Sequence, residues 1–305
     1  MNHHAIAIGP DAATAIVRRC LDPALTVTDV RPMHGGSMNR VLEWTTDGRP
    51  RQLVAKVNTA RSAGAFHREA EMLAIYREAE LPVPEVYAEI EPSGDFDGCG
   101  LLMQRIPGHN LAEARLTPAG RAAFQHQLAR YIAHLHTHRR ATYGSAHRPA
   151  GPEAWVDAFQ PVIAQEYDAV REALSSRTRN IVEDLLAALP PWLDGAGPPT
   201  LVHGDLWSTN LLVDDAHPDR PELLAFIDGQ ASYSDPDYEL AYLRLFHTAD
   251  DRFFRDYHRR HPRREGFERR CRVYWLSTML MHVRVFGDRY VAACEDMARR
   301  VKRMV

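Results

Sequence analysis

Short apolar runs separated by turn signals dominate the first hundred residues and predict β-strands. Between two of these runs, Asp47-Gly48 is a strong hairpin signal. Glycine or proline stands at most of the other ends of these apolar runs. The expected strands are 26–33, 40–45, 53–57, 86–90 and 99–105. Together they predict a small, five-stranded antiparallel sheet.

A helical pattern interrupts these strands at 61–79. Phe66 and Leu73 recur at helical spacing and define an inner face. Glu69 lies on the same face, whereas Glu71 is rotated by roughly 200° around the helix axis and is expected to face solvent. A carboxylate on a packed face needs a partner. The pattern therefore predicts that Glu69 pairs with a cation.

Lys56, within one of the predicted strands, is the natural partner of Glu69. A surface pair within the helix of Glu69 is the alternative. The turn Gly35-Gly36-Ser37 stands between the first two strands, where backbone N–H groups of glycines can approach phosphate oxygens. Each feature alone is weak evidence. Their order along the chain is the one expected when a loop covers nucleotide phosphates above a strand lysine.

The remainder of the chain is mostly helical in pattern. Thr117-Pro118 is a good N-cap and first-turn pair. Asp237 is expected to cap a later helix, with support of the loop at 203–205 as the alternative role. Helices are expected at 11–20, 117–138, 152–174, 178–189, 238–246 and 271–286. The sequence thus predicts an α+β protein with an N-terminal sheet lobe, 1–106, and a mostly helical C-terminal lobe, 107–305.

The stretch 201–230, LVHGDLWSTNLLVDDAHPDRPELLAFIDGQ, holds the candidate chemistry. Two short apolar strands lead to carboxylates, at Asp205 and Asp228, and Asn210 follows Asp205 by five positions. This pattern suits phosphoryl transfer. Asp205 could accept a hydroxyl proton, while Asn210 and Asp228 offer the hard oxygen ligands that Mg²⁺ prefers. A β-hairpin with ordinary turn carboxylates is the alternative.

Composition narrows the function classes. The 305 residues are 45% hydrophobic and 25% charged, and the net charge of -3 argues against a general nucleic-acid binder. The basic segment 259–272 is expected to be a solvated surface, with a site for an anionic partner as the alternative. Four scattered cysteines favour a reducing cytosol. No signal peptide or membrane span is evident, so a cytoplasmic protein without a membrane partner is expected; its oligomeric state is not indicated.

The order His203-Gly204-Asp205, Asn210 and Asp228 matches the catalytic-loop spacing of kinases. The His-Gly-Asp form resembles small-molecule kinases such as aminoglycoside and choline kinases. With Trp207, the motif HGDLW most resembles the fructosamine (ketosamine) kinase family. This resemblance, which runs from about residue 26 to about residue 290, implies a bilobal protein-kinase-like fold. It also implies ATP-dependent phosphorylation of a hydroxyl on a sugar-derived ketosamine, with ATP and Mg²⁺ as cofactors.

The resemblance implies roles for individual residues. Asp205 would be the catalytic base, and Asn210 and Asp228 would hold Mg²⁺. The residues expected to meet the nucleotide are Gly35, Gly36, Ser37, Lys56, Glu69, Met103, Gln104 and Ile106, the last three at a hinge beside the adenine. Trp207 and Thr209 are expected beside the acceptor.

The sequence differs from the family pattern at two places close to the expected acceptor, and these differences bear on which substrate is phosphorylated. Gly229 and Gln230 stand where fructosamine kinases commonly have Pro-Ala, and Thr209 replaces a glycine. The phosphorylation machinery therefore transfers better than the identity of the acceptor. Two alternatives stay open: a kinase of another small molecule, such as an aminoglycoside, an amino alcohol or a different sugar, and a nucleotide-binding regulatory pseudokinase.

Overall fold

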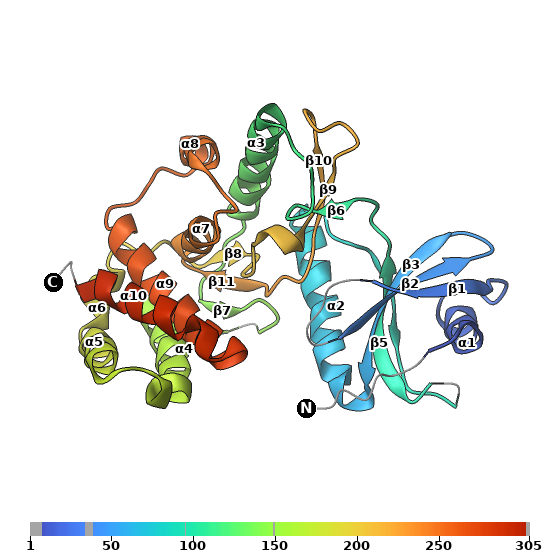
Figure 1. Ribbon diagram of the computed structural model, residues 1–305, viewed down its shortest axis with the longest axis horizontal. Coiled ribbons are helices and arrows are strands. Elements are labelled where there is room, and N and C mark those ends of the chain that lie inside the picture. Colours follow the sequence, from blue (N-terminus) through green and yellow to red (C-terminus); the bar gives the residue numbers. More distant parts are fainter. Residues whose placement is uncertain (1–7, 34–38, 95, 149, 303–305) are drawn as a thin grey trace. The chain divides into compact units, whose positions relative to one another are not determined.

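The computed structural model describes residues 8–33, 39–94, 96–148 and 150–302. The chain divides into two compact units (Figure 1). Unit 1 comprises Met1–His109 and Leu224–Asp228, and unit 2 comprises Asn110–Leu223 and Gly229–Val305. The chain therefore leaves unit 1 after His109, returns to it for the short segment Leu224–Asp228, and then completes unit 2.

Unit 1 is built on an antiparallel sheet in the order β1-β2-β3-β5-β4. Its strands are β1 (Val27–Pro32), β2 (Arg40–Thr46), β3 (Gln52–Thr59), β4 (Val86–Ile90) and β5 (Gly98–Gln104). The strand β3 lies in the middle, where Lys56 stands opposite Val41 of β2 and Leu101 of β5. The predicted five-stranded sheet is confirmed.

Helices pack on both faces of this sheet. The core on one face joins α1 (Pro10–Cys20) to Leu53, Ala55 and Leu102 of the strands. The core on the other face joins α2 (Ala63–Glu78), which follows the 3-10 turn η1 (Ala60–Ser62), to Val54, Leu101 and Met103. Successive residues of a strand point to opposite faces. Lys56, two positions after Val54, therefore points to the face that α2 covers.

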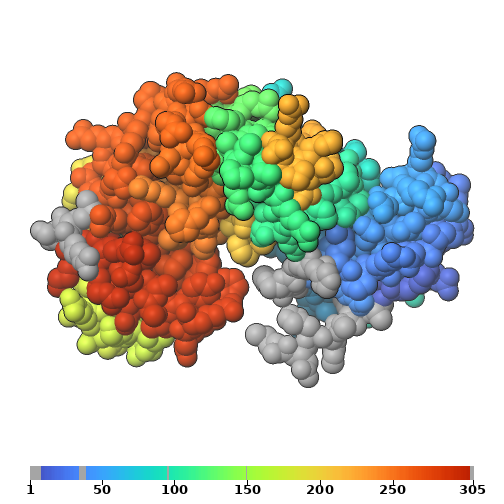
Figure 2. Space-filling view, turned by 45° about the horizontal axis from the view of Figure 1, so that its top comes forward, coloured from blue at the N-terminus to red at the C-terminus, as the bar shows by residue number. Residues whose placement is uncertain are grey.

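Unit 2 is mostly helical. Its helices are α3 (Pro118–Leu135), α4 (Trp155–Val170), α5 (Ser176–Ala187), α6 (Leu189–Leu193), α7 (Pro236–Leu245), α8 (Asp251–Arg260), α9 (Phe267–Phe286) and α10 (Val291–Lys302). Short 3-10 turns stand at η2 (Arg171–Ala173), η3 (Ser208–Asn210) and η4 (Asp288–Tyr290). The helices α4, α7 and α10 pack on α9. In Figure 2 the chain from α8 to α10, orange to red, forms much of the visible surface of this unit. The predicted α+β class is confirmed.

Three short strands of unit 2 pair in the order β7-β11-β8. They are β7 (Gly144–Ser145), β8 (Thr200–Val202) and β11 (Ser232–Ser234). The strand β11 pairs on both sides and is therefore the middle strand of this sheet. Of the other short strands, β6 (His109–Asn110) and β10 (Glu222–Phe226) span points at which the chain changes unit, and β9 (Leu211–Asp214) precedes β10.

Pro190 and Pro191 lie inside α6, since the first turn of a helix does not use the N–H that proline lacks. One expectation from the sequence is wrong. The segment 259–272 is not a solvated surface throughout, because Arg270 is 0% exposed. Its guanidinium lies 2.6 Å from Asp237, an ion pair inside unit 2.

Among the described residues, none of the helices has the length and hydrophobicity that crossing a membrane requires.

Candidate functional site

In unit 1, one lysine is held between two carboxylates. Lys56 Nζ lies 2.6 Å from Glu69 Oε1 and also donates to Asp228 Oδ1. The side chains of Lys56 and Glu69 are 14% and 19% exposed. Burial acts to lower the pKa of Lys56, but the charges of Glu69 and Asp228 outweigh it, and the pKa is raised. The lysine is thus a fixed ammonium, and its predicted pairing with Glu69 is confirmed.

Lysine is scarce in this chain, which makes Lys56 more informative. Of the 37 basic residues, all are arginine except Lys56 and Lys302. An ammonium is a compact point charge with three rotatable donors, whereas a guanidinium is a planar fork with five. The half-enclosed position between Glu69 and Asp228 suits the compact ammonium group. This gives a physical reason for a lysine at position 56 in a chain that otherwise uses arginine almost throughout.

Asp228 reaches Lys56 from a distant part of the sequence. It ends the segment Leu224–Asp228, which is tied to unit 1 by a hydrogen bond of 2.8 Å from the Phe226 N–H to the Pro82 carbonyl. The φ angle of Asp228 is +57°, in the left-handed region that few residues besides glycine, asparagine and aspartate adopt. Such backbone is frequent at functional sites. The contact with Lys56, more than this backbone conformation, distinguishes Asp228 from an ordinary turn carboxylate.

In unit 2, His203-Gly204-Asp205 follows β8 directly. Gly204 has a φ of +82°, and a Cβ at this position would lie 2.7 Å from the Gln230 carbonyl oxygen. The Gln230 N–H donates to the His203 carbonyl at 2.7 Å. Glycine alone fits both this backbone conformation and this close approach. The loop that presents Asp205 is thus fixed against Gln230.

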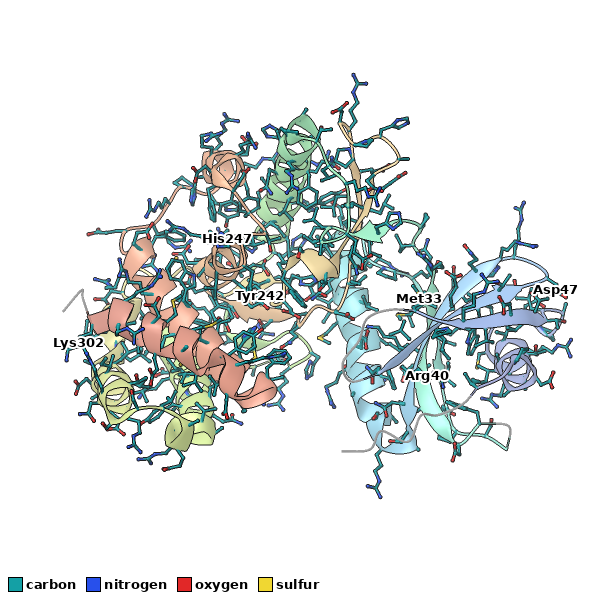
Figure 3. The ribbon with its side chains drawn as sticks, in the orientation of Figure 1. Met33, Arg40, Asp47, Tyr242, His247 and Lys302 are labelled. Carbon is teal, nitrogen blue, oxygen red and sulfur yellow. The ribbon has the colours of Figure 1, made fainter. Side chains whose placement is uncertain are left out.

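Two side chains of unit 2 donate hydrogen bonds to the Asp205 carboxylate. Tyr242 Oη of α7, labelled in Figure 3, lies 2.5 Å from Asp205 Oδ1. Asn210 Nδ2 lies 3.0 Å from Asp205 Oδ2 and 2.9 Å from the Asp205 carbonyl oxygen. The Asp205 side chain is half-buried. Its carboxylate is therefore oriented from two directions.

The amide nitrogen of Asn210 is engaged with Asp205, which leaves the amide oxygen as the atom that can bind a cation. Mg²⁺ prefers oxygen ligands and commonly binds one or two carboxylates together with substrate phosphates. Asn210 and Asp228 each have this donor chemistry, although Asp228 Oδ1 also accepts from Lys56. Within the described residues, no group of three or more His, Cys, Asp or Glu is arranged to hold a metal ion. Taken singly, each residue has the donor chemistry of a ligand to a cation that arrives with a phosphate.

A buried chain of hydrogen bonds supports the loop. Glu239 Oε1 accepts the Gly204 N–H at 2.8 Å, and Glu239 Oε2 lies 2.9 Å from His136 Nε2. Tyr257 Oη lies 2.7 Å from His136 Nδ1. The side chains of His136 and Glu239 are each 1% exposed. Burial raises the pKa of Tyr257, so that its hydroxyl keeps its proton. This chain fixes the backbone next to Asp205.

Sequence reasoning does not find Glu239, His136 or Tyr242. It assigns Asp237 to helix capping, which is wrong, and gives support of the loop as the alternative, which stays a prediction. Asp235 caps α7, and Asp237 pairs with arginine side chains. The available signal is the position of Glu239 among the apolar residues of α7, where a buried carboxylate requires a partner.

The three residues assigned to the hinge lie at and just beyond the end of β5. Met103 is 4% exposed and packs in the core under α2. The Gln104 N–H donates to the Glu85 carbonyl at 2.7 Å, and the Ile106 carbonyl accepts from the Arg105 guanidinium. These groups are thus used inside unit 1, and their contact with an adenine stays a prediction. Gly35, Gly36 and Ser37 lie outside the described residues.

Trp207 and Thr209 follow Asp205 closely in the loop. The Trp207 side chain is 42% exposed, so its ring is accessible for stacking against a ligand. The Thr209 hydroxyl lies 3.5 Å from Asn210 Oδ1 and is half-buried. Their contact with an acceptor stays a prediction.

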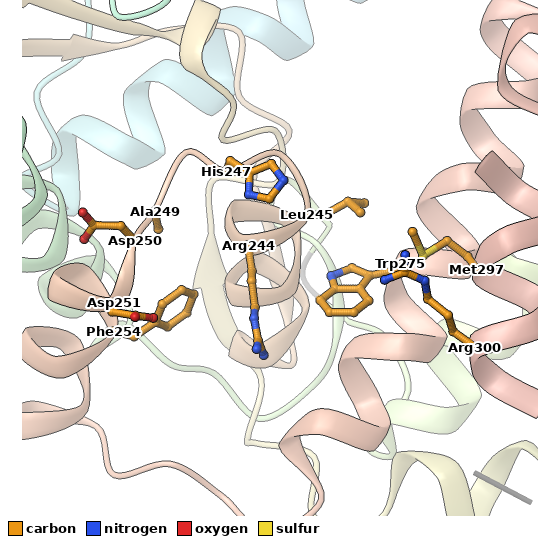
Figure 4. Close-up of a pocket in the computed structure, with 10 residues that line it drawn as sticks. All are labelled: Arg244, Leu245, His247, Ala249, Asp250, Asp251, Phe254, Trp275, Met297 and Arg300. Atoms are coloured by element: carbon orange, nitrogen blue, oxygen red, sulfur yellow. The ribbon is translucent and has the colours of Figure 1, made fainter. Parts of the chain in front are cut away.

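A hollow elsewhere in unit 2 has a volume of about 530 Å³. Figure 4 shows residues that line it. Side chains from α7 to α10 line it, and two of its cations are paired: Arg244 with Glu268 and Arg300 with Asp296. None of the residues predicted for the site is among those drawn in Figure 4. The hollow is therefore separate from the candidate chemistry.

The sequence of this chain is similar to those of proteins named as ketosamine or ketoamine kinases. Mouse ketosamine-3-kinase is 31% identical over 105 residues, which are 34% of this chain and 32% of the mouse protein. An Enterococcus faecium protein assigned as a ketoamine kinase is 26% identical over 286 residues, 88% of this chain and 93% of that protein. The match thus spans about a third of the first relative and most of the second.

Solved structures share the fold. A Haemophilus somnus protein assigned as a fructosamine-3-kinase has a TM-score of 0.74 at 18% identity, with 95% of this chain and 97% of that chain covered. A thermostable mutant of aminoglycoside phosphotransferase APH(4)-Ia, in ternary complex with AMP-PNP and hygromycin B, has a TM-score of 0.70 at 22% identity, with 96% and 98% covered. At these identities the likeness is one of fold alone.

The model of the phosphotransferase enzyme family matches residues 29–272, a range that includes all the residues predicted for the site. The resemblance to fructosamine kinases within this family, expected from HGDLW, is confirmed by the relatives. Because the match covers most of its length, this chain belongs to the phosphotransferase enzyme family.

Proposed function

We propose that this protein is an ATP-dependent kinase that phosphorylates a hydroxyl of a sugar-derived ketosamine. The observation that supports this most is the Lys56 ammonium between Glu69 and Asp228, in a chain whose family transfers phosphoryl groups. A phosphotransferase needs fixed positive charge for the nucleotide, a group that takes the acceptor proton, and ligands for a divalent cation. Each need has a candidate in the chain.

In unit 1, Lys56 holds the nucleotide phosphates, and Glu69 keeps its ammonium pointed away from solvent. Asp228 is a cation ligand, with Asn210 of unit 2 as the second. When bound, Mg²⁺ offsets the negative charge of the phosphates. The loop of Gly35, Gly36 and Ser37 covers these phosphates, and Met103, Gln104 and Ile106 meet the adenine.

In unit 2, Asp205 orients the acceptor hydroxyl and takes its proton as the oxygen becomes the nucleophile. The hydrogen bond from Asn210 to Asp205 prepares the carboxylate for this task, since a positioned base avoids reorganisation during the reaction. Trp207 and Thr209 contact the acceptor. Trp207 is suited to stack on the apolar face of a sugar ring.

The acceptor class rests on the relatives, which are named ketosamine and ketoamine kinases. A second candidate, phosphorylation of another small molecule, has specific observations in its favour. The sequence departs from the fructosamine-kinase pattern at Gly229, Gln230 and Thr209. The Gln230 N–H also donates a hydrogen bond to His203, in the loop of Asp205. Substitutions there are expected to alter the acceptor more than the transfer step.

The decisive experiment measures Mg²⁺-dependent ADP release with a panel of acceptors: fructosyl-lysine, ribulosyl-lysine, free sugars, amino alcohols and an aminoglycoside. Wild type is compared with Asp205→Asn, and Asp184→Asn on the exposed side of α5 is the matched control. Ketosamine-dependent release that falls by roughly a hundredfold or more in Asp205→Asn alone supports the proposal, given the usual contribution of a general base.

The other outcomes are equally informative. Turnover confined to another acceptor keeps the roles of Asp205 and Lys56 and removes the ketosamine. Binding of Mg-ATP with no turnover on any acceptor would overturn the proposal in favour of a regulatory pseudokinase.

A further inference from the structure

One face of α7 contacts two consecutive residues of the loop. Glu239, Tyr242 and Phe246 are spaced by three and four positions, which places them along one side of the helix. Glu239 accepts the N–H of Gly204 at 2.8 Å, and Tyr242 donates to Asp205 at 2.5 Å. The first contact fixes main chain. The second fixes the carboxylate itself.

The Tyr242 ring has little freedom to leave Asp205. It is 8% exposed, and its centroid lies 4.6 Å from that of Phe246. Phe246 in turn stacks on His282 of α9 at 5.3 Å. Because neighbouring rings fix its plane, the hydroxyl is aimed at Asp205 before any acceptor arrives.

The hydroxyl acts as a donor in this contact. Burial, together with the charge of Asp205, raises the pKa of Tyr242, so that the phenol keeps its proton. A hydrogen bond from a hydroxyl to an ionised carboxylate is short and strong compared with a neutral one. A carboxylate has about four lone-pair positions. Tyr242 and Asn210 each take one of these positions, on different oxygens of Asp205, and together they orient the carboxylate.

We propose that Tyr242 is a positioning residue that holds the Asp205 carboxylate in the orientation that receives the acceptor hydroxyl. This inference rests on the proposed role of Asp205 as the base. Tyr242 acts through Asp205 and needs no contact with the acceptor or the nucleotide. In the sequence it resembles an ordinary buried aromatic residue of a helix, and the site residues predicted from the sequence do not include it.

The first test requires no turnover and uses crystal structures of the wild type and of Tyr242→Phe, which keeps the ring and removes the hydroxyl. In the wild type, Tyr242 Oη is expected within hydrogen-bond distance of Asp205. In the variant, the Asp205 carboxylate is expected to rotate or to occupy more than one conformer, while Asn210 keeps its place. An unchanged, single Asp205 conformer in Tyr242→Phe would overturn the inference, whether or not the enzyme turns over.

The second test compares kinetics on whichever acceptor the wild type uses. In Tyr242→Phe, kcat is expected to fall about tenfold with the KM for ATP unchanged, which indicates loss of an interaction that acts in the transition state. In an Asp205→Asn background, the same substitution is expected to cause no further loss, because coupled residues are non-additive. A second, equal loss in that background would show that Tyr242 does not act through Asp205.

Tyr238→Phe is the matched control. Tyr238 lies one turn earlier on α7, and its ring packs against Phe159 and Tyr274. Its substitution is expected to leave kcat and the Asp205 conformer unchanged. If Tyr242→Phe does not fold, Phe246→Leu loosens the same ring while keeping the hydroxyl, and it is expected to disorder Asp205 in the crystal. Failure of every acceptor would remove the proposed function, and the crystal structures would still decide the role of Tyr242.

Discussion

The Glu239 carboxylate accepts the main-chain N–H of Gly204 at 2.8 Å, one residue before the candidate base Asp205. Its second oxygen lies 2.9 Å from His136, and both side chains are buried. A buried carboxylate that bonds to two donors is costly to disturb, because either donor is left unsatisfied when it is lost. The hydrogen bond to the Gly204 N–H, one of the contacts that support the loop, thus depends on Glu239.

Glu239→Gln keeps the shape of this side chain and removes its charge. One amide can still accept from Gly204, but its NH₂ group then faces His136, so one of the two bonds is lost. We expect the free energy of unfolding to fall by about 2 kcal/mol, the usual contribution of a hydrogen bond to a charged group. Urea denaturation measures the effect. Glu172→Gln, at a side chain that is 85% exposed, should change it by no more than about 0.5 kcal/mol. Equal effects of the two substitutions would contradict the role of Glu239 in supporting the loop.

Unit 1 follows from the sequence to a large extent, because two independent periodicities agree there. The strand pattern places Lys56 on the face opposite Leu53 and Ala55, and the helix pattern places Glu69 beside Phe66, so the two charges meet on one face. Nothing in the pattern of 224–228 indicates that its contacts lie in unit 1. The meeting of Asp228 with Lys56 is a long-range contact that local periodicity does not encode.

The contacts of unit 2 are harder to predict from the sequence, because they too are long-range contacts that local periodicity does not encode. A tyrosine in an apolar helix has the same pattern whether its hydroxyl ends in solvent or, like Tyr242, on a carboxylate. The strand β11 is too short to show alternation, and only its pairing with β7 and β8 makes it a strand. Arg270 looks like one of a run of surface arginines until its partner Asp237 is known.

Lys56 should be protected by nucleotide in a way that Lys302 is not. The chain has no other lysine, so an amine-acylating reagent has two side-chain targets that mass spectrometry separates. We expect the exposed Lys302 to react faster, because the Lys56 side chain is only 14% exposed and its pKa is raised. Mg-ATP at about ten times its Kd should slow labelling of Lys56 roughly tenfold, because only the unoccupied protein reacts. Equal labelling of Lys56 with and without Mg-ATP would remove it from the nucleotide site.

Asp228→Asn should separate the chemistry of Asp228 from its backbone conformation. Asparagine tolerates the left-handed φ of this position, so the fold should persist, while the loss of charge should raise the Mg²⁺ concentration for half-maximal ADP release by roughly tenfold. Asp228→Ala adds backbone strain and should lower stability by a further 1 kcal/mol or so. Mg²⁺ titrations of activity and thermal unfolding measure the two effects. An unchanged Mg²⁺ requirement in Asp228→Asn would contradict the role as a ligand.

His282 should make stability depend on pH below neutrality. It is 7% exposed, its Nδ1 lies 2.8 Å from the Thr278 carbonyl, and burial lowers its pKa below the ordinary 6.5. As pH falls below 6.5, the unfolded chain binds a proton that the folded state excludes, so stability is lost. His282→Gln removes this loss, and its difference in free energy of unfolding from wild type should shrink as pH falls. His217→Gln, at an exposed histidine, should follow the wild type at every pH. Parallel curves for wild type and His282→Gln would refute the prediction.

Arg270 and Asp237 form a buried ion pair whose two members should respond differently to substitution. Arg270→Met leaves Asp237 buried without its main partner and should lower the free energy of unfolding by about 3–5 kcal/mol. The pKa of Asp237 is raised from 3.8 to about 6. Burial is the larger cause, and the negative charge of Asp235 is the second. Between these values the folded state holds a proton that the unfolded chain has released, so stability falls as pH rises through this window.

Asp237→Asn cannot titrate, and its free energy of unfolding should therefore change less than that of the wild type between about pH 4 and pH 6. Urea denaturation at intervals across this range measures both curves, and Asp184→Asn on the exposed side of α5 is the control. A wild-type curve that rises through the window would show that the two guanidinium groups, Arg264 and Arg270, outweigh burial and hold Asp237 ionised. In that case Arg270→Met should produce the falling curve instead, because half of the compensating charge is gone.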